Sequence, residues 1–409
     1  MHKMLRPGLQ LGVATWAGTV GMWGCAGDSE MRYDSALLFS DSAGVEVVSF
    51  DADRLPPPVR VDPVPEWVLG EGQDSDLRLD LYRVVDVTAL SDERVAVAEG
   101  STQSILVLDR SEGTTKRLGG DGDGPSEFRA IARLFLSDED ALSAYDARRN
   151  RLLTFHLDGD VVEERSLPRV AASGNIPRLD IDGEGRIYLA VIPALPEGAG
   201  IERPRGGIFT VNEEVDTLTT VRGREVFRNS MGTGAVIFGS TTWTAADAGH
   251  GIWIGDTAER EIGLWRGSGG PTRIVRWGSD GLREVSESDI ASFWAALDGA
   301  VPSGDPRPSN VMQDVLPFAE QWPAFGRLLV AGEGDLWVSR PLDPAVEFLS
   351  DEEPPPEEWT VVRFREGRAE RVVTPGGFRV MEVRGDRLLG VHQDDLGVET
   401  VRQYRWQSP

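Results

Sequence analysis

The feature that most constrains this chain is a pair of short strands that recurs at a regular spacing. Val95–Glu99 and Ile105–Asp109 are alternating apolar segments joined by a polar connection, as half-buried paired strands are. The pair occurs twice more, as Leu142–Asp146 with Leu152–Leu157 and as Ile252–Asp256 with Ile262–Trp265. From Glu99 to Asp146 is 47 residues, and from Asp146 to Asp256 is 110, or two repeats of 55. Periods of about 40–50 residues with several short strands are typical of radial all-β folds.

Three weaker copies extend the series, each a strand that follows a Gly- and Asp-rich turn. They are Arg186–Ala190, Asp335–Ser339 and Arg387–Val391. The pattern therefore predicts an all-β, six-bladed β-propeller, with blades near residues 84–118, 131–167, 178–221, 241–277, 325–373 and 378–407. The last blade shows only three strands, so we expect a strand from residues 45–68 to complete it and close the ring. Closure removes the exposed strand edges of an open sheet.

Two motifs add a resemblance to a known family. Gly122–Phe128 (GDGPSEF) and Asp146–Arg151 (DARRNR) resemble the NHL repeat. Together with Asp41–Val48 near its start, the chain is similar to the bacterial 6-bladed beta-propeller lipoproteins. Most members of that family lack an assigned activity, so the resemblance implies a fold and a surface location more than a chemistry.

The N-terminus has the pattern of an export signal. A basic start is followed by an apolar stretch, Leu9–Met22, that is too short to span a membrane as a helix. Cys25, the only cysteine of the chain, comes directly after it in the position of a lipobox cysteine. We expect a lipoprotein signal peptide over 1–24, lipidation of Cys25, a tether over 25–44 and the propeller over 45–409. Ala26 favours an outer-membrane lipoprotein of the cell envelope, and the alternatives are a plain secreted protein or no export.

One segment has helical rather than strand periodicity. In residues 283–300 a serine can cap the helix and Ile290, Phe293, Trp294 and Leu297 share one face. Pro302, Pro306 and Pro308 follow. We therefore predict a helical and Pro-rich insertion over 283–323, between blades four and five, that covers part of one propeller face.

The charge of the chain excludes one class of partner. The net charge is −25, and removal of residues 1–24, which contain Lys3 and Arg6 but no acid, makes it −27. Such a surface repels nucleic acids and anionic lipid headgroups. We expect no nucleic acid partner, membrane contact through the lipid anchor only, and a monomer. Only two lysines occur, and we assign the arginine excess to genome composition rather than to individual contacts.

Equivalent strand ends suggest a candidate ligand site. The second strand of every blade runs to the same rim, so Glu99, Asp146, Asp256, Arg340 and His392 can surround the mouth of the central channel. Three acids beside one Arg and one His favour a cation or a cationic group. The alternative is that each side chain caps its own loop.

Other motifs carry little chemistry. Gly119–Gly124 is followed by neither GK[ST] nor a helix, so it is a connection between blades rather than a phosphate loop. Asp121 and Asp123 lack the third carboxylate of a calcium loop, and calcium there stays an alternative. The histidines lack zinc-site spacing, and GxSxG and HExxH are absent from the sequence.

The sequence therefore supports two main functions. The first is a cell-envelope-anchored β-propeller without a cofactor that binds a small-molecule ligand or a protein and performs no catalysis. The alternative is a metal-dependent lactonase-, esterase- or lyase-like enzyme that uses one divalent cation such as calcium in the central channel. A third reading, a purely structural envelope protein, lacks a specific binding face.

Overall fold

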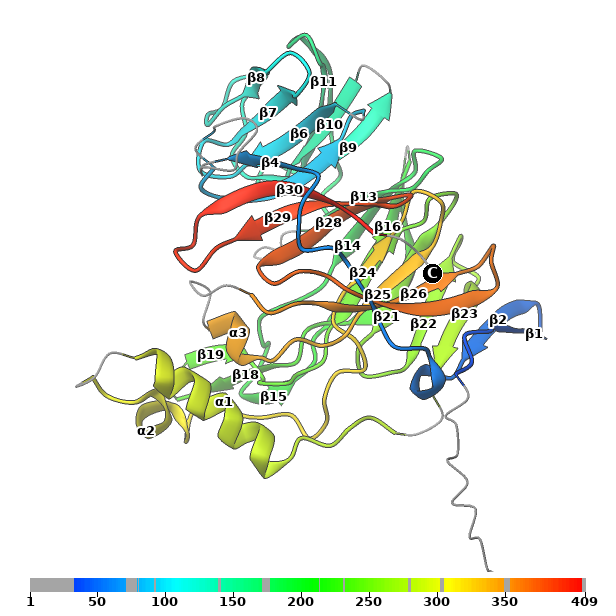
Figure 1. The fold of residues 1–409 in the computed structure, drawn as a ribbon, viewed down its shortest axis with the longest axis vertical. Helices are drawn as coiled ribbons and strands as arrows, with labels where there is room; N and C mark the ends of the chain where they lie inside the picture. The colour runs from blue at the N-terminus through cyan, green and yellow to red at the C-terminus, as the bar shows by residue number, and fades with distance from the viewer. Residues whose placement is uncertain are drawn as a thin grey trace, which may run out of the picture. The chain divides into compact units, whose positions relative to one another are not determined.

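The computed structural model describes residues 33–406 apart from 71–78, 80, 92, 139–140, 171–176, 213, 231, 279–280, 302–304 and 349–353. The predicted signal peptide and Cys25 lie outside the described residues. The described chain forms six antiparallel four-stranded blades, so the six-bladed β-propeller predicted from the repeats is confirmed (Figure 1).

The strands of each blade follow one another from the channel outward. Blades one and two are β5 (Val84–Ala89), β6 (Arg94–Glu99), β7 (Ser104–Asp109) and β8 (Thr114–Gly119), then β9 (Ile131–Asp138), β10 (Ala141–Asp146), β11 (Arg151–His156) and β12 (Val161–Ser166). Blades three and four are β13 (Arg178–Ile181), β14 (Ile187–Val191), β16 (Arg205–Val211) and β17 (Val215–Arg222), then β20 (Thr242–Ala246), β21 (Ile252–Asp256), β22 (Glu261–Trp265) and β23 (Pro271–Trp277). Blade five is β24 (Leu328–Val330), β25 (Leu336–Ser339), β26 (Glu358–Arg363) and β27 (Arg368–Val373), and blade six contains β28 (Phe378–Arg384), β29 (Arg387–Gln393) and β30 (Glu399–Arg405).

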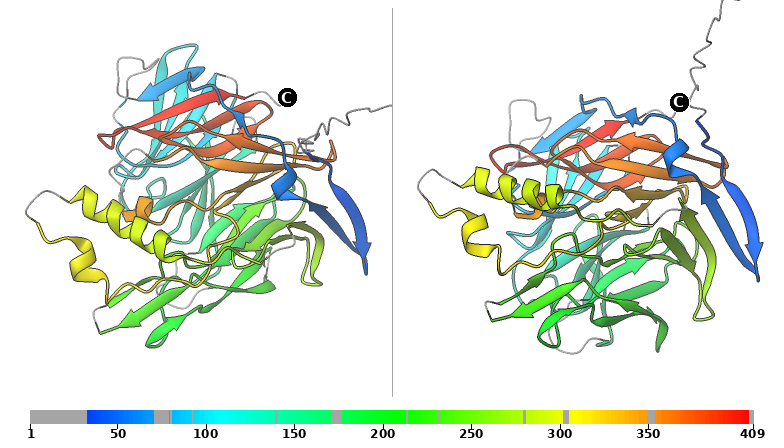
Figure 2. Two further views of the ribbon diagram at one scale, coloured as in Figure 1. Left: turned by 60° about the horizontal axis from the view of Figure 1, so that its bottom comes forward. Right: turned by 90° about the horizontal axis from the view of Figure 1, so that it is seen from below.

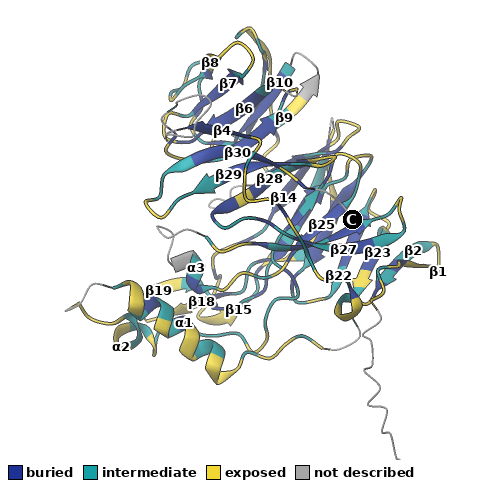
Figure 3. Cartoon of the chain, in the orientation of Figure 1, coloured by how far each residue is buried: buried dark blue, intermediate teal, exposed yellow. Residues whose placement is uncertain are grey.

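The core lies between neighbouring blades, because the middle strands bury both faces. In β6, Ala96 and Ala98 pack with side chains of blade two, whereas Val95 and Val97 pack with side chains of blade six. Successive side chains of a strand point to opposite faces, so an uninterrupted apolar run is what a strand between two sheets requires. Figure 3 shows this burial along the inner strands.

The N-terminal segment closes the ring. Residues 33–70, which we call the strap, cross the outer edges of three blades in order. β1 (Leu38–Ser42) and β2 (Val45–Phe50) extend blade four, and β3 (Val59–Arg60) pairs with β27 of blade five. β4 (Trp67–Gly70) pairs with β30 and is the fourth strand of blade six. A single-turn helix, η1 (Ala52–Arg54), lies between β2 and β3.

Two boundaries differ from the sequence prediction. The closing strand begins at Trp67, near the end of the predicted range 45–68. The folded unit also begins before residue 45, because Leu37 is buried and β1 pairs with β2. The part of the predicted tether from Tyr33 onward therefore belongs to the propeller. Alternation of apolar residues does not reveal an edge strand such as β1, whose residues are all exposed.

Insertions from three blades gather on one side of the ring, and together we call them the cap. Helices α1 (Glu287–Ala300) and α2 (Pro308–Met312) lie between blades four and five, as predicted, and α3 (Ala345–Phe348) lies within blade five. A small sheet of β15 (Gly200–Glu202), β18 (Val226–Asn229) and β19 (Gly232–Ala235) joins them. Figures 1 and 2 show α1 beside this sheet. Ser286 and Asp289 form a capping box at the start of α1.

The cap has its own apolar core. Phe293 and Leu297 of α1 are buried against Ile237 and Phe238, which follow β19. The ring centroids of Phe238 and Trp322 are 4.4 Å apart. Phe238 has a positive φ of 60°, which is costly for a bulky residue and persists only where the surrounding packing holds it. The cap is therefore a packed structure rather than a set of loose loops.

Candidate functional site

The three carboxylates expected at the channel mouth each bind nearby loop residues rather than one another. Glu99 accepts hydrogen bonds from the backbone and side chains of Ser101 and Thr102. Burial alone raises the pKa of Glu99, but these hydrogen bonds outweigh it and lower the pKa below its usual value. Asp256 accepts from Ala258 N at 3.0 Å and pairs with Arg203 at 2.9 Å.

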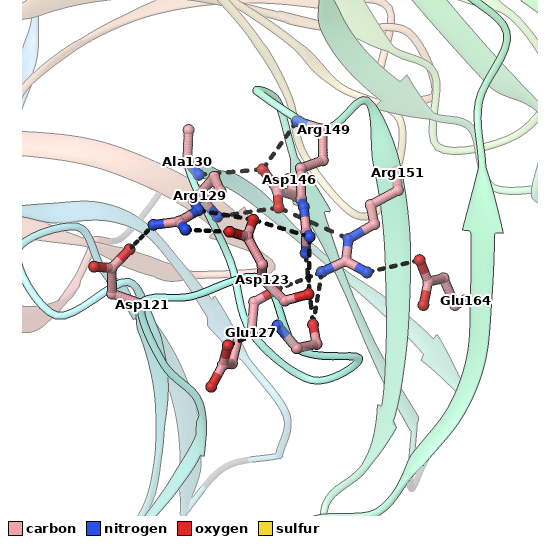
Figure 4. Close-up of polar contacts among 10 residues, drawn as sticks. Asp121, Asp123, Glu127, Arg129, Ala130, Asp146, Arg149, Arg151 and Glu164 are labelled. Carbon is pink, nitrogen blue, oxygen red and sulfur yellow. Dashed lines mark hydrogen bonds and ion pairs between the residues drawn. The ribbon is translucent and has the colours of Figure 1, made fainter.

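Asp146 is fully buried and holds the connection between blades one and two (Figure 4). Its oxygens accept hydrogen bonds from the backbone N–H groups of Arg129, Ala130 and Arg149, at 3.1, 3.1 and 3.3 Å. The Arg151 Nε atom lies 3.8 Å from Oδ2. This carboxylate is therefore part of the loop structure.

Arg340 and His392 also do not form a common site with the three carboxylates. The Arg340 side chain is 72% exposed and pairs with Glu358 at 3.4 Å. His392 is half-buried, and burial, together with the nearby Arg402, lowers its pKa to about 4. Among the described residues, no hydrogen bond or ion pair joins any two of Glu99, Asp146, Asp256, Arg340 and His392. None of the five lines either of the two large cavities described below.

The acids of the Gly119–Gly124 turn are paired with arginines. Asp123 binds Arg129 and Arg149, and Asp121 lies 3.5 Å from Arg129 (Figure 4). The Arg129 side chain lowers the pKa of Asp123. Within the described parts of the chain, no group of three or more His, Cys, Asp or Glu side chains has the spacing to hold a metal ion.

The described residues form two large cavities that adjoin one another. The central channel has a volume of about 630 Å³ and is lined by the first strand of every blade. The second cavity, of about 930 Å³, lies between the cap and the ring, and we call it the cap cavity. Arg178, Trp243 and Arg327 line both, so the two spaces adjoin at these side chains.

The walls of the cap cavity are mostly apolar. Five representative lining side chains are Phe227, Val236, Phe238, Leu316 and Trp322, from the cap sheet and the segments around the helices. Its size is at the upper end of the range for small-molecule sites, roughly 300–1,000 Å³. Such a cavity offers an apolar body a place away from water.

Arginines are concentrated where the cap cavity meets the ring. Arg178 begins β13, Arg327 directly precedes β24, and Arg379 is the second residue of β28. All first strands start at the same rim, so these side chains enter the cavity from three blades. Arg224 lines it as well, and the acids of the lining are Asp343 and Glu357. The lining thus has more positive than negative side chains, the reverse of the negative channel mouth expected from the sequence.

Arginines of three first strands lie at a similar position in the pairing of the first strand with the second. Arg133 lies opposite Tyr145, Arg178 opposite Ala190 and Arg379 opposite Val391. In each blade the partner precedes the end of the second strand by one or two residues. Trp243 occupies this position in blade four, opposite Gly255. In blade five, Arg327 directly precedes β24 and accepts a backbone hydrogen bond from Ser339, the last residue of β25. First strands are nearest the axis, whereas second strands lie about 4.8 Å further out, which is why the ends of the second strands do not line the cavities.

Arg178 has an unusual environment. Its guanidinium carbon lies 4.6 Å from the centroid of the Trp243 ring, and the residue is exposed to the cavity. Burial by the surrounding walls lowers its pKa. By contrast, Arg327 donates to Glu357 at 2.6 Å and to the Val380 carbonyl at 2.8 Å. Arg379 donates to the Val84 carbonyl at 3.3 Å.

The channel itself contains a buried charge network. Arg133 lies 3.1 Å from Asp180 and 4.0 Å from Asp86, and Thr244 donates to Asp180 at 3.1 Å. Burial raises the pKa of Asp86 to about 6, against the opposing effects of Arg133 and two backbone hydrogen bonds. Glu382 accepts from Thr88 at 2.7 Å. These contacts link neighbouring blades around the channel.

The sequence contains a signal for these arginines. Four blades have Arg followed by an aliphatic residue in the first strand or directly before it, namely Arg133-Leu134, Arg178-Leu179, Arg327-Leu328 and Arg379-Val380. Assigning the arginine excess to genome composition hid this repetition. Its meaning also depends on knowing which strand of each blade is innermost.

Comparison with known proteins supports the fold. A family model described as "6-bladed beta-propeller" matches residues 77–188, which contain blades one and two and the start of blade three. The resemblance predicted from Gly122–Phe128 and Asp146–Arg151 is thereby confirmed over this part of the chain. No curated protein matches the chain.

Three solved structures are similar at low identity. A Bacteroides fragilis protein whose description assigns it to export is 10% identical, with a TM-score of 0.46 over 88% of this chain and 100% of its own. A DUF4221-family member from Bacteroides vulgatus is 12% identical, with a TM-score of 0.46 over 85% and 99%. A Xanthomonas campestris gluconolactonase is 12% identical, with a TM-score of 0.39 over 86% and 98%. At these values the similarity carries no argument about activity.

Proposed function

We propose that this protein is an exported, envelope-anchored β-propeller that binds a small organic molecule in the cap cavity. The observation that carries the proposal is the cavity of about 930 Å³, which lies between the ring and a separately packed cap and has mostly apolar walls. Largely pre-formed cavities with apolar walls and a few polar groups are the usual form of ligand sites. None of the described helices is both long and apolar enough to cross a membrane. Export and lipidation at Cys25 remain part of the proposal.

The test uses a neutral apolar fluorophore, N-phenyl-1-naphthylamine, and the folded mature chain. We expect saturable fluorescence enhancement with the wild type and loss of most of it in Ala235→Trp. Ala235 is half-buried in the cavity wall, so an indole there fills the space without exposing the cap core. Ala291→Trp, on an exposed position of α1, is the matched control and should bind like the wild type.

A second variant tests the cap directly. Val285 N donates to Glu320 O at 2.9 Å, so a short turn can replace residues 286–319. We expect this excision to leave the ring folded and to abolish the fluorophore binding that Ala235→Trp blocks. Absence of saturable binding by the wild type, or equal binding by wild type and Ala235→Trp, would contradict the proposed function.

One observation favours the enzymatic alternative, a lactonase-, esterase- or lyase-like propeller. Asp86 is a buried carboxyl in the central channel with a pKa raised to about 6, in the range where an acid or base works near neutral pH. Turnover of lactones or esters that is lost in Asp86→Asn would support it. Stoichiometric calcium or another divalent ion in the purified mature protein would support the metal-dependent form.

A further inference from the structure

The junction of the cap cavity and the channel holds an arginine whose donors are available. Within the described residues, the Arg178 guanidinium has no hydrogen bond or ion pair, and its close contact is with the face of Trp243. Stacking on an aromatic ring uses the face of a guanidinium and leaves the N–H groups at its edge free. Arg178 can therefore donate to a group that enters the cavity.

The corresponding arginines of the other blades have other partners. Arg133 pairs with Asp180, and Arg327 with Glu357. Arg379 makes one hydrogen bond, to a backbone carbonyl, which leaves its charge without a carboxylate partner among the described residues. The free capacity for an anion is therefore greatest at Arg178, with Arg379 adding positive potential from the far wall.

The net charge of the chain favours small anions over polyanions at this site. The net charge of −25 disfavours the approach of polyanions such as nucleic acids. A small anion inside a walled cavity is screened from that surface and faces arginines instead. Guanidinium groups match the planar fork of a carboxylate and also bind other oxyanions.

We propose that the cap cavity binds an amphipathic organic anion, with its apolar body against the cap and its carboxylate or similar oxyanion on Arg178. The inference rests on the proposed function and names its ligand class. The polar end points to the channel, where Arg178 and Trp243 line both spaces, and the apolar end points to Phe238 and Leu316.

The experiment compares 11-(dansylamino)undecanoic acid with its methyl ester, which lacks the negative charge and carries one additional methyl group. A hydrogen bond to a charged group corresponds to about a 10- to 100-fold change in affinity. We expect the wild type to bind the acid about tenfold more tightly than the ester. Arg178→Met should lower affinity for the acid about tenfold or more and leave affinity for the ester within about twofold.

Two further variants locate the effect. Arg379→Met should weaken acid binding less than Arg178→Met does. Arg276→Met removes an exposed arginine of β23, in the outer part of blade four, that pairs with Glu261 and lines neither cavity. This variant should bind both probes with the affinity of the wild type. Circular dichroism and urea unfolding establish that each variant is folded.

The outcomes separate the two proposals. Equal affinity of acid and ester in the wild type, or an equal loss for both in Arg178→Met, overturns the anion inference while binding of the neutral fluorophore still supports the cavity. Binding of neither dansyl probe nor of N-phenyl-1-naphthylamine overturns both.

Discussion

Buried carboxylates of this protein differ in how completely their charge is balanced. Asp146 has no exposed surface and accepts three backbone hydrogen bonds. Asp86 accepts two, from Val87 and Leu134, and its nearest cation is 4.0 Å away. An ionised group taken from water is stabilised only where such partners replace its hydration. Asp146 is therefore expected to support the fold near neutral pH, and Asp86 to weaken it.

Replacing Asp146 with Ala should lower the free energy of unfolding by about 2–3 kcal/mol, because it leaves three part-buried N–H groups without this acceptor. Asp146→Asn keeps part of the acceptor capacity and should cost less. Glu163→Ala, at an exposed position of the same blade, is the control and should change stability by less than about 0.5 kcal/mol. Urea unfolding measures all three, and equal effects at Asp146 and Glu163 would refute the capping role.

Asp86 predicts a specific pH dependence. Its pKa is about 6 in the folded state and near 3.8 when unfolded, so between these values the folded state holds a proton that the unfolded state releases. The contribution of Asp86 to the free energy of unfolding therefore falls by on the order of 2–3 kcal/mol as the pH rises from 4 to 7. Asp86→Asn lacks this titration. A stability difference between wild type and Asp86→Asn that stays constant from pH 4.5 to 7.5 would show the prediction to be wrong.

The strap and the cap are the two elements that depart most from a plain ring. The strap pairs with the outer edges of blades four, five and six, and it buries Trp67 and Leu69 in the core next to blade one. Full burial of such side chains contributes about 1.5–3 kcal/mol each. The strap is therefore a structural closure, whereas the cap encloses the proposed site.

Truncation of the strap tests this difference. A chain beginning at residue 33 should unfold cooperatively, whereas one beginning at residue 71 should lose cooperative unfolding and aggregate. The loss of β4 exposes the edge of β30. The truncation also removes buried side chains whose summed contribution to the free energy of unfolding is comparable with the whole stability of a domain. Thermal unfolding followed by circular dichroism, with light scattering, distinguishes the two. A stable, soluble chain beginning at residue 71 would contradict the closing role of β4.

At the scale of the whole molecule, the negative charge of the protein and the proposed lipid anchor both affect membrane association. A net charge of −25 keeps the protein soluble and repels anionic lipid surfaces, so membrane association through the folded surface is disfavoured. A covalent lipid at Cys25 would supply the attachment that the folded surface does not. Cys25 lies outside the described residues, and this part of the proposal rests on the sequence.

Replacing Cys25 with Ser tests the anchor. We expect the variant to remain unprocessed by the lipoprotein signal peptidase and to leave the outer-membrane fraction. Cell fractionation and labelling with a radioactive fatty acid measure both. Unchanged membrane association without label would show that something other than Cys25 lipidation holds the protein there.

The sequence by itself determined the blade number, the blade positions and the helix of the cap. These follow from local patterns: a period of two in strands such as Val95–Glu99, turn residues between them, and a helical face with a capping serine at Ser286. Local patterns are readable because backbone sterics and side-chain alternation act over a few residues.

Only the tertiary structure decided where the candidate site lies. Glu99 and Asp146, predicted at the channel mouth, lie at the ends of second strands and bind nearby loop residues. Arg178 begins a first strand, Arg327 directly precedes one, and both line the cavities. Which strand faces the axis depends on the pairing of whole blades, and the cap cavity forms from segments near residues 230, 316 and 342 that are distant in the chain. Spacing along the sequence does not encode such convergence, because long-range packing brings these segments together.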